Sequence, residues 1–151
     1  MVTASELVRA VPDPELRVVT IGDLGIVRDI EVHGAQVVVT ITPTYSGCPA
    51  MDAIRSDISA ALRDAGFADI SVKTVLAPAW STDWITDAGR SKLAAAGIAP
   101  PGRTVGLALT VRCPQCGSPD TEELSRFGST ACKSLWRCRS CSEPFDAVKT
   151  L

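Results

Sequence analysis

Apolar residues recur with two different periods along the first hundred residues of the chain. Residues 26–32 and 36–41 are rich in β-branched side chains and flank Gly34, which predicts a β-hairpin. Residues 51–62 repeat apolar side chains every three or four positions, which predicts a helix that Gly66 ends. We expect three further elements: a short helix opened by a capping box of Thr3 and Glu6 and closed by Pro12, a strand over residues 70–76, and a helix over residues 86–96. The order strand–strand–helix–strand predicts an α+β fold, in which helices cover one face of a small mixed sheet.

A segment rich in proline and glycine, residues 97–102, interrupts this pattern. We therefore expect one domain over residues 1–102 and a second over residues 103–151. The second domain has short strand-like runs over residues 121–127, 134–137 and 144–148. A piece this small cannot bury enough apolar surface to fold by itself, so it needs a metal ion or disulfides.

The composition narrows the classes of partner. The chain has 151 residues, with 15 Lys and Arg against 17 Asp and Glu, and a formal net charge of −2. This balance offers no electrostatic attraction to nucleic acid or to an anionic membrane, so we expect neither as a partner. The sequence shows no secretory signal and no apolar run of the roughly 18 residues that cross a membrane. The expected location is the cytoplasm, where six cysteines indicate metal or thiol chemistry rather than disulfides.

Four of the six cysteines form two C-x2-C pairs. Cys113 and Cys116 are followed, after 21 residues, by Cys138 and Cys141. Each pair allows a tight turn to aim two thiolates at one ion, and two such turns complete a tetrahedron, which is a zinc ribbon pattern. With no open ligand position the Zn²⁺ would be structural. Iron in a rubredoxin-like site and paired thiols without a metal are the alternatives.

The remaining cysteines, Cys48 and Cys132, stand apart from these pairs. Cys48 precedes Pro49 at the predicted start of a helix, where the helix dipole and free N–H groups favour a thiolate. It could equally be a small buried hydrophobe. A Cys–His enzyme finds little support, because the single imidazole, His33, is predicted at an exposed hairpin turn. Cys132 is either a ribbon core residue or a second accessible thiol.

Two further groups have both a structural and a functional interpretation. Asp13 and Glu15 flank a proline, and they form either a solvated turn or a pair of carboxylates near Cys48. Trp80 and Trp84 lie four residues apart, and they either cap the core or form an aromatic surface that binds a partner. The residues alone do not decide between these interpretations.

Several stretches resemble one family. Residues 13–15 (Asp-Pro-Glu), 21–27 (Ile-Gly-Asp-Leu-Gly-Ile-Val) and 42–49 (Thr-Pro-Thr-Tyr-Ser-Gly-Cys-Pro) resemble the small iron–sulfur assembly domain of SufT-type and cytosolic iron–sulfur targeting factors. Residues 80–86 and the ribbon stretch 127–133 narrow the resemblance. Over its whole length the chain is similar to the PaaD (also called PaaJ) family, which is encoded with the multicomponent phenylacetyl-CoA ring-1,2-epoxidase.

The resemblance implies an accessory role in phenylacetate catabolism, in which the chain helps to assemble or insert an iron–sulfur or di-iron centre and does not turn over substrate itself. The family's reactive cysteine corresponds to Cys48, and its acid to Asp13, with Glu15 beside it. A transient iron ion or iron–sulfur cluster on Cys48 is the implied cargo. The implied partners are the reductase or oxygenase components of the epoxidase, the iron–sulfur assembly machinery and a second copy in a homodimer. A structural or regulatory subunit of the oxygenase and a thiol enzyme using Cys48 are the competing hypotheses.

Overall fold

The computed structural model describes residues 1–45, 47–101 and 111–149. By its internal contacts the chain divides into two compact units, Met1–Thr86 and Asp87–Leu151. The boundary predicted at residue 102 lies outside the described residues. The contacts divide the chain earlier because the strand Ile98–Ala99 pairs with a strand near the C-terminus.

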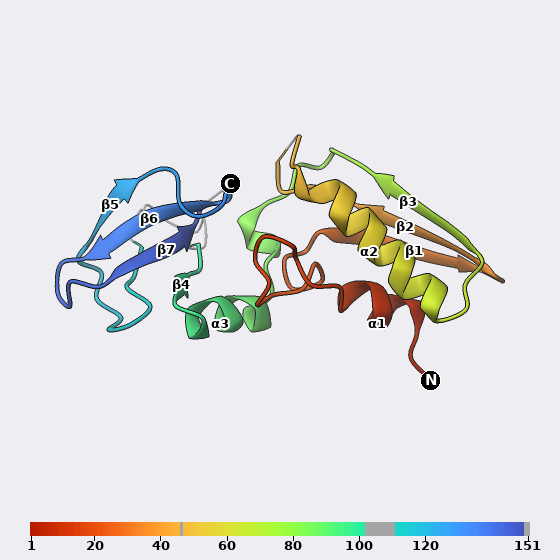
Figure 1. Cartoon of the computed structure of the whole chain (residues 1–151), viewed down its shortest axis with the longest axis horizontal. Coiled ribbons are helices and arrows are strands. Elements are labelled where there is room, and N and C mark those ends of the chain that lie inside the picture. The colour runs from red at the N-terminus through yellow and green to blue at the C-terminus, as the bar shows by residue number, and fades with distance from the viewer. Residues whose placement is uncertain (46, 102–110, 150–151) are drawn as a thin grey trace. The chain divides into compact units, whose positions relative to one another are not determined.

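The first unit is a three-stranded sheet with two helices on one face (Figure 1). Its elements, in order, are α1 (Ala4–Arg9), β1 (Val27–His33), β2 (Gln36–Ile41), α2 (Ala50–Asp64), β3 (Asp69–Thr74) and the 3-10 turn η1 (Thr82–Trp84). The sheet order is β1-β2-β3, with β1 antiparallel and β3 parallel to β2. The α+β fold with a mixed sheet is therefore confirmed.

Local sequence signals explain where these elements begin and which of their faces point to the core. Thr3 and Glu6 form both hydrogen bonds of the predicted capping box at the start of α1. Ile54, Ile58 and Leu62 of α2 lie four residues apart and are fully buried, as a core-facing helix requires. On β2 the alternate positions Val37, Val39 and Ile41 are fully buried, so one face of this central strand belongs to the core.

The second unit contains a ribbon of three longer strands. Its elements are α3 (Asp87–Ala95), β4 (Ile98–Ala99), β5 (Thr121–Ser125), β6 (Lys133–Cys138) and β7 (Pro144–Val148), in sheet order β4-β7-β6-β5. The described core cluster is small and includes two cysteines: Ala99, Cys113, Cys138, Phe145 and Ala147, with Val111 and Trp136 packed against it. The three predicted strand runs of the ribbon are confirmed, although β5 ends at Ser125 rather than at Phe127.

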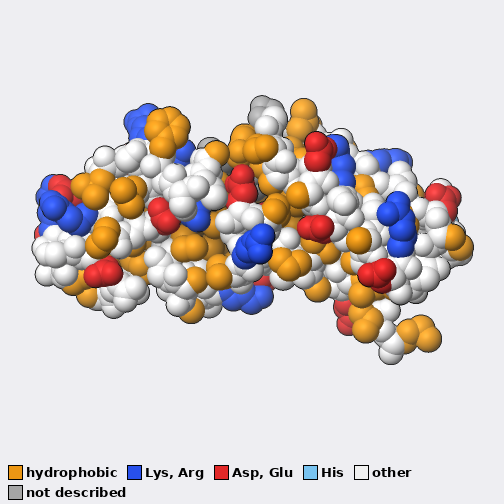
Figure 2. Space-filling view, viewed as in Figure 1, with side chains coloured by type: hydrophobic (Ala, Val, Ile, Leu, Met, Phe, Trp, Pro, Cys, Tyr) orange, Lys and Arg blue, Asp and Glu red, His pale blue; other side chains and the backbone are white. Residues whose placement is uncertain are grey.

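Charged side chains are mixed on the visible surface. In the face that Figure 2 shows, Lys and Arg side chains alternate with Asp and Glu side chains and do not gather into a large patch of one sign. Among the described residues, no helix is both long and apolar enough to cross a membrane.

A glycine contact provides a test of the packing in the first unit. Gly25 has φ +72°, and a Cβ placed on it would lie 2.6 Å from the Cβ and carbonyl oxygen of Trp84. Gly25→Ala should therefore lower the free energy of unfolding by about 3 kcal/mol, through backbone strain and overpacking. Gly34 is the matched control, since it has φ +64° but nothing within 4 Å, and Gly34→Ala should cost only about 1 kcal/mol. Urea titration of both variants measures the difference, and equal losses would contradict the close packing against Trp84.

Candidate functional site

The four paired cysteines converge on one point in the ribbon. The sulfur atoms of Cys113, Cys116, Cys138 and Cys141 all lie within 4.8 Å of one another. The Sγ atoms of Cys113 and Cys141 are 3.7 Å apart, and those of Cys116 and Cys138 are 3.5 Å apart. Sulfurs bound to a tetrahedral zinc ion at about 2.3 Å lie about 3.8 Å from one another. The separations fit a single four-coordinate ion, and all four cysteines are free of disulfides.

Each cysteine pair is shaped by the same local turn. The N–H of Gln115 points at the Cys113 sulfur and the N–H of Cys141 at the Cys138 sulfur, each at 3.4 Å. The residue after each pair has a left-handed backbone, with φ +74° at Gly117 and φ +65° at Ser142. Backbone N–H groups aimed at sulfur stabilise the thiolates that a zinc ion needs.

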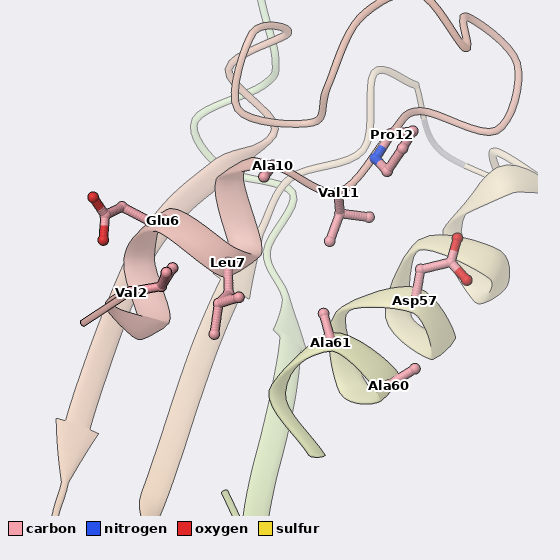
Figure 3. Close-up of a pocket in the computed structure, with 9 residues that line it drawn as sticks. All are labelled: Val2, Glu6, Leu7, Ala10, Val11, Pro12, Asp57, Ala60 and Ala61. Carbon is pink, nitrogen blue, oxygen red and sulfur yellow. The ribbon is translucent and has the colours of Figure 1, made fainter. Parts of the chain in front are cut away.

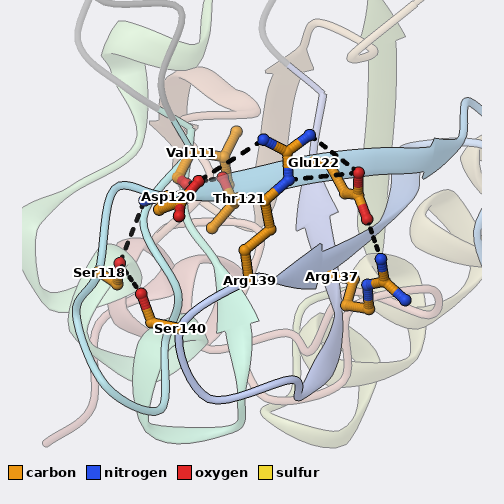
Figure 4. A network of polar contacts seen from close by, with 8 residues as sticks. All are labelled: Val111, Ser118, Asp120, Thr121, Glu122, Arg137, Arg139 and Ser140. Carbon is orange, nitrogen blue, oxygen red and sulfur yellow. Dashed lines mark hydrogen bonds and ion pairs between the residues drawn. The ribbon is translucent and has the colours of Figure 1, made fainter.

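A network of polar side chains joins the two cysteine turns (Figure 4). The hydroxyls of Ser118 and Ser140, one beside each turn, are 2.8 Å apart, and the backbone N–H of Arg139 donates to the carbonyl of Asp120 at 2.9 Å. The Arg139 guanidinium also pairs with the Glu122 carboxylate at 3.0 Å. Hydrogen bonds from Arg139 and then Arg137 lower the pKa of Glu122, so this carboxylate stays ionised at neutral pH. The network thus ties the turns to β5 by contacts that do not involve the sulfurs.

The thiols hold their protons unequally. The hydrogen bond from the Cys141 N–H lowers the pKa of Cys138 to about 7. A backbone hydrogen bond from Glu143 acts in the same direction on Cys141, but burial and the neighbouring thiols raise the pKa of Cys141 to about 12. At Cys116, too, a backbone hydrogen bond from Ser118 is outweighed by the Cys138 sulfur and by burial, so its pKa is raised. An incoming metal ion must therefore displace protons from this site.

Cys48 lies in the loop between β2 and α2. Helix α2 begins at Ala50 with Pro49 as its N-cap, so Cys48 lies one residue before the cap rather than within the first turn. Its carbonyl accepts a hydrogen bond from the N–H of Met51 at 3.2 Å, and its side chain is half-buried. Within the described part of the chain, no side chain hydrogen-bonds to this thiol. The sulfur is thus placed near a helix start without a base beside it.

His33 does not supply that base. It lies on β1 beside the hairpin turn, it is exposed, and its Nε2 is 3.3 Å from a carboxylate oxygen of Glu31. Cys48 follows the opposite end of β2, and the length of that strand, Gln36–Ile41, corresponds to about 17 Å. The prediction that His33 sits at an exposed turn is confirmed.

Asp13 has a structural task within its own loop. It is 6% exposed, and its Oδ1 accepts hydrogen bonds from the N–H groups of Glu15 at 2.9 Å and Leu16 at 2.7 Å. The Glu15 carboxylate, in contrast, is half-exposed. Asp13 therefore holds the turn that positions Glu15, and the assignment of both residues to a site with Cys48 stays a prediction.

Backbone hydrogen bonds connect the Asp13 loop to the strand that leads to Cys48. Ile21 donates to Val11, Ile26 donates to Ile21, and Thr42 donates to Ile26, at distances of 2.8, 3.1 and 2.9 Å. The sequence pattern assigns no role to Thr42 itself. Its side chain is 1% exposed, and in the described structure its hydroxyl has no hydrogen-bond partner. A buried hydroxyl without a partner costs about 1–3 kcal/mol, so Thr42 is an additional candidate for a ligand contact in this loop.

The two tryptophans after β3 belong to different environments. Trp80 is 7% exposed, and its indole N–H donates to the carbonyl of Leu24 at 2.7 Å, so it is a core residue. Trp84 is half-buried, and the guanidinium carbon of Arg28 lies 3.8 Å from its ring centroid. Because Trp80 is buried, the two rings do not form one exposed aromatic surface.

A shallow apolar groove of about 470 Å³ lies between α1 and α2 (Figure 3). Leu7 and Val11 face Ala61 across it, and the carboxylates of Glu6 and Asp57 are at its borders. Glu6 is already engaged in the capping box, and hydrogen bonds from Thr3 lower its pKa. The groove contains none of the predicted site residues.

Cys132 is not part of the four-cysteine cluster. It lies in the loop between β5 and β6, it is half-buried, and its sulfur is 3.1 Å from the Thr130 hydroxyl. It is therefore neither a ligand of the cluster nor a fully buried core residue.

Comparison with known proteins finds a different family match for each part of the chain. Residues 4–75 match the family of iron–sulfur cluster assembly proteins, and residues 98–149 match the PaaD zinc beta ribbon domain. Over 148 residues the chain is 47% identical to a protein of Escherichia coli (strain K12) that is named as a putative subunit of the 1,2-phenylacetyl-CoA epoxidase, covering 96% of this chain and 90% of that protein. The chain belongs to the PaaD family. The identity confirms the family that the sequence motifs indicated. The match of residues 98–149 shows that the four cysteines of this PaaD-family chain belong to a zinc ribbon domain, which is consistent with bound zinc.

Two solved structures resemble the first unit of the PaaD-family chain. One is a domain of unknown function, DUF59, from Bacillus anthracis, which is 32% identical, has a TM-score of 0.55, and covers 60% of this chain and 87% of its own. The other is a conserved hypothetical protein of Thermotoga maritima, which is 28% identical, has a TM-score of 0.50, and covers 61% of this chain and 94% of its own. Both support the same fold for the N-terminal part.

Loss of one cluster sulfur tests whether the ribbon needs its metal. Cys116→Ser removes one of four thiolates, and it should abolish zinc binding and unfold the region around residues 111–149, since its described core is too small to fold alone. Zinc content and the thermal unfolding curve measure both effects. Cys132→Ser, which leaves the cluster intact, should keep its zinc and its unfolding curve. A normal unfolding curve for Cys116→Ser would contradict a structural metal.

Zinc affinity should fall as the pH falls. The ion binds thiolates, and the Cys141 thiol, whose pKa is raised to about 12, must lose a proton at every pH used. The Cys116 thiol, whose pKa is also raised, loses a proton as well. Each of these two protons lowers the affinity about a hundredfold between pH 8 and pH 6, and protonation of Cys138 adds to the loss below its pKa of about 7. Competition against a chelator of known pH dependence measures the slope, and an affinity independent of pH would contradict the assignment.

Proposed function

We propose that the chain is an accessory factor of the phenylacetyl-CoA ring-1,2-epoxidase, and that it assists the assembly or insertion of an iron–sulfur or di-iron centre through Cys48. The observation that carries the proposal is the 47% identity, over 96% of the chain, to a protein named as a putative subunit of this epoxidase. The match of residues 4–75 to iron–sulfur cluster assembly proteins supports the kind of assistance proposed.

Cys48 is the residue on which the proposed transfer depends. Its thiol is half-buried and lies next to the start of α2, one residue before the N-cap Pro49. One thiolate is too few to hold a stable cluster, which takes four ligands. The cargo iron or cluster would complete its ligand set with the client, a small thiol or a second copy of the chain, and such a shared site can release what it carries.

Asp13, Glu15 and Thr42 have supporting roles in this proposal. Asp13 holds its turn through two backbone N–H groups, which leaves the half-exposed Glu15 as the carboxylate better able to approach a metal ion. Carboxylate oxygens bind iron, and they could share the cargo with the thiolate. The partnerless hydroxyl of Thr42 at the start of the same loop is a further polar contact for it.

Turnover of substrate by the chain itself is not part of the proposal. A cysteine nucleophile is usually activated by an adjacent base, and in the described structure no imidazole or carboxylate is hydrogen-bonded to the Cys48 sulfur. The zinc ribbon offers no open ligand position for catalysis either, because all four ligands are cysteines. Its proposed role is structural, with surfaces left for recognition.

A structural or regulatory subunit of the oxygenase is the second candidate. The name of the Escherichia coli relative, which calls it a subunit, favours this candidate. The two functions differ in how long the chain stays bound to the epoxidase. A maturation factor associates transiently with the reductase or oxygenase components and with the iron–sulfur assembly machinery, whereas a subunit remains in a stoichiometric complex. A cytoplasmic location and a homodimer are parts of the first proposal.

Replacement of the Cys48 sulfur separates the two functions. Cys48→Ser should reduce phenylacetyl-CoA epoxidation in cells to the level seen without the chain, because the thiolate that holds the cargo is lost. Zinc content and thermal unfolding of the purified variant should be unchanged, since Cys48 is outside the ribbon. Cys132→Ser is the matched control and should retain epoxidation. Normal epoxidation with Cys48→Ser would refute the carrier role and leave the subunit role standing.

A further inference from the structure

The loop between β5 and β6 exposes apolar side chains at one end of the ribbon. We call residues 124–131 the ribbon tip. Phe127 is 78% exposed and Leu124, at a β-bulge in β5, is 50% exposed. Phe127 is the sole aromatic residue among the large hydrophobic side chains that are exposed in the described structure. Two large apolar side chains exposed within one short segment make this segment a candidate for a surface that another molecule covers.

The metal site does not account for this exposure. Strand β6 begins at Lys133, next to the tip, and ends at the ligand Cys138, so the tip and the cysteine cluster lie at opposite ends of the strand. Six residues of extended chain place them about 17 Å apart. The tip therefore neither shields the cluster nor supplies it with a ligand.

Hydrogen bonds hold the tip in one conformation. The N–H of Gly128 donates to the carbonyl of Lys133 at 2.9 Å, and the N–H of Lys133 donates to the carbonyl of Thr130 at 3.1 Å. The hydroxyl of Ser129 donates to Asp146 of β7 at 3.2 Å. A Cβ on Gly128 would lie 2.9 Å from a carboxylate oxygen of Asp146 and 3.1 Å from the carbonyl oxygen of Lys133, so there is little room for a side chain at this position. Phe127 is thus presented on a rigid loop, which lowers the entropic cost of binding through it.

Two cations lie beside Phe127, and the carboxylates nearby are engaged by Arg126 and Ser129. The Lys149 ammonium donates to the carbonyl of Ala131 at 2.9 Å and lies 5.1 Å from the centroid of the Phe127 ring. The Arg126 side chain is 88% exposed, and its contact with Glu123, at 3.9 Å, is long. Arginine and aromatic residues are the types most enriched where protein interfaces gain their affinity.

We propose that the ribbon tip is a docking surface, and that it inserts Phe127 into an apolar pocket on a protein whose rim carries carboxylates. The cations at Arg126 and Lys149 select for such a rim. This inference rests on the proposed function, which makes an epoxidase component the expected protein. Nucleic acid is a poorer fit, because the chain has a formal net charge of −2 and Figure 2 shows no large patch of positive charge on the visible face.

Binding of the full-length, zinc-loaded chain to immobilised epoxidase components tests the proposal. The probes are the purified oxygenase and the purified reductase of the epoxidase, each in turn. Phe127→Ser should weaken binding to one of them about 10- to 100-fold, the loss expected when a buried phenylalanine is removed. Arg126→Glu should weaken the same binding and reduce its salt dependence.

Two controls make the result specific. Leu76→Ser removes another exposed apolar side chain, 62% exposed and in the other unit, and it should bind as the wild type does. The zinc content of Phe127→Ser should equal that of the wild type, which shows that the ribbon has folded.

Each other outcome has a definite meaning. If the wild type binds and Phe127→Ser binds equally well, the docking surface is refuted while the proposed function stands. If the wild type binds neither component, the docking surface is refuted, and if epoxidation in cells is also independent of the chain, the proposed function is refuted with it. Two further outcomes would overturn the proposal while component binding stays unchanged. If Phe127→Ser loses self-association, the tip binds a second copy of the chain instead, and if it loses binding to a single-stranded oligonucleotide, the tip binds nucleic acid.

Discussion

A ribbon of three strands with a core of a few residues folds only when something other than apolar burial holds its loops in place, and in this chain four converging sulfur atoms do so. Two of the five buried residues of its core cluster, Cys113 and Cys138, are themselves in the four-cysteine site. The site and the core are therefore one structure. A structural zinc ion supplies folding free energy on the order of 10 kcal/mol, so zinc bound at these four sulfurs would also stabilise the fold of the ribbon.

The first unit, in contrast to the ribbon, is stabilised mainly by burial of apolar side chains. Its core is an apolar layer between two helices and a sheet, and its loops are closed by backbone hydrogen bonds, such as those that Asp13 accepts. The thiol of Cys48 takes no part in this closure, since it is half-buried and has no hydrogen-bond partner in the described structure, although the Cys48 backbone does hydrogen-bond within the loop. A side chain on which stability does not depend is free for chemistry, which is the physical basis for placing the proposed cargo there.

The ribbon consequently has two ends with different properties. At one end the metal site is closed, with every ligand position occupied by cysteine, and it has nothing to exchange. At the other end the tip is fixed by backbone and side-chain hydrogen bonds and exposes Phe127 beside the Lys149 ammonium. A small metal-stabilised ribbon tolerates this exposure because its own core does not need that ring.

Much of the fold followed from short-range patterns that act within a few residues. The capping box of Thr3 and Glu6, the hairpin around Gly34 and the apolar spacing along α2 were all predicted, because each depends on neighbours in the chain. The pairing of β4 with β7 was not, because it joins segments about fifty residues apart in the chain. The resemblance of the motifs to the PaaD family was likewise sufficient to name the family.

The sequence by itself determined which residues form the metal site, since the spacing of two C-x2-C pairs already requires two turns that can share an ion. Only the tertiary structure decided which of the remaining candidates are free to act. It buried Trp80 against the carbonyl of Leu24, committed Asp13 to its own turn, and left Phe127 uncovered. The physical reason is that ligand spacing is a local property of the chain, whereas exposure and hydrogen-bond satisfaction depend on segments distant in sequence.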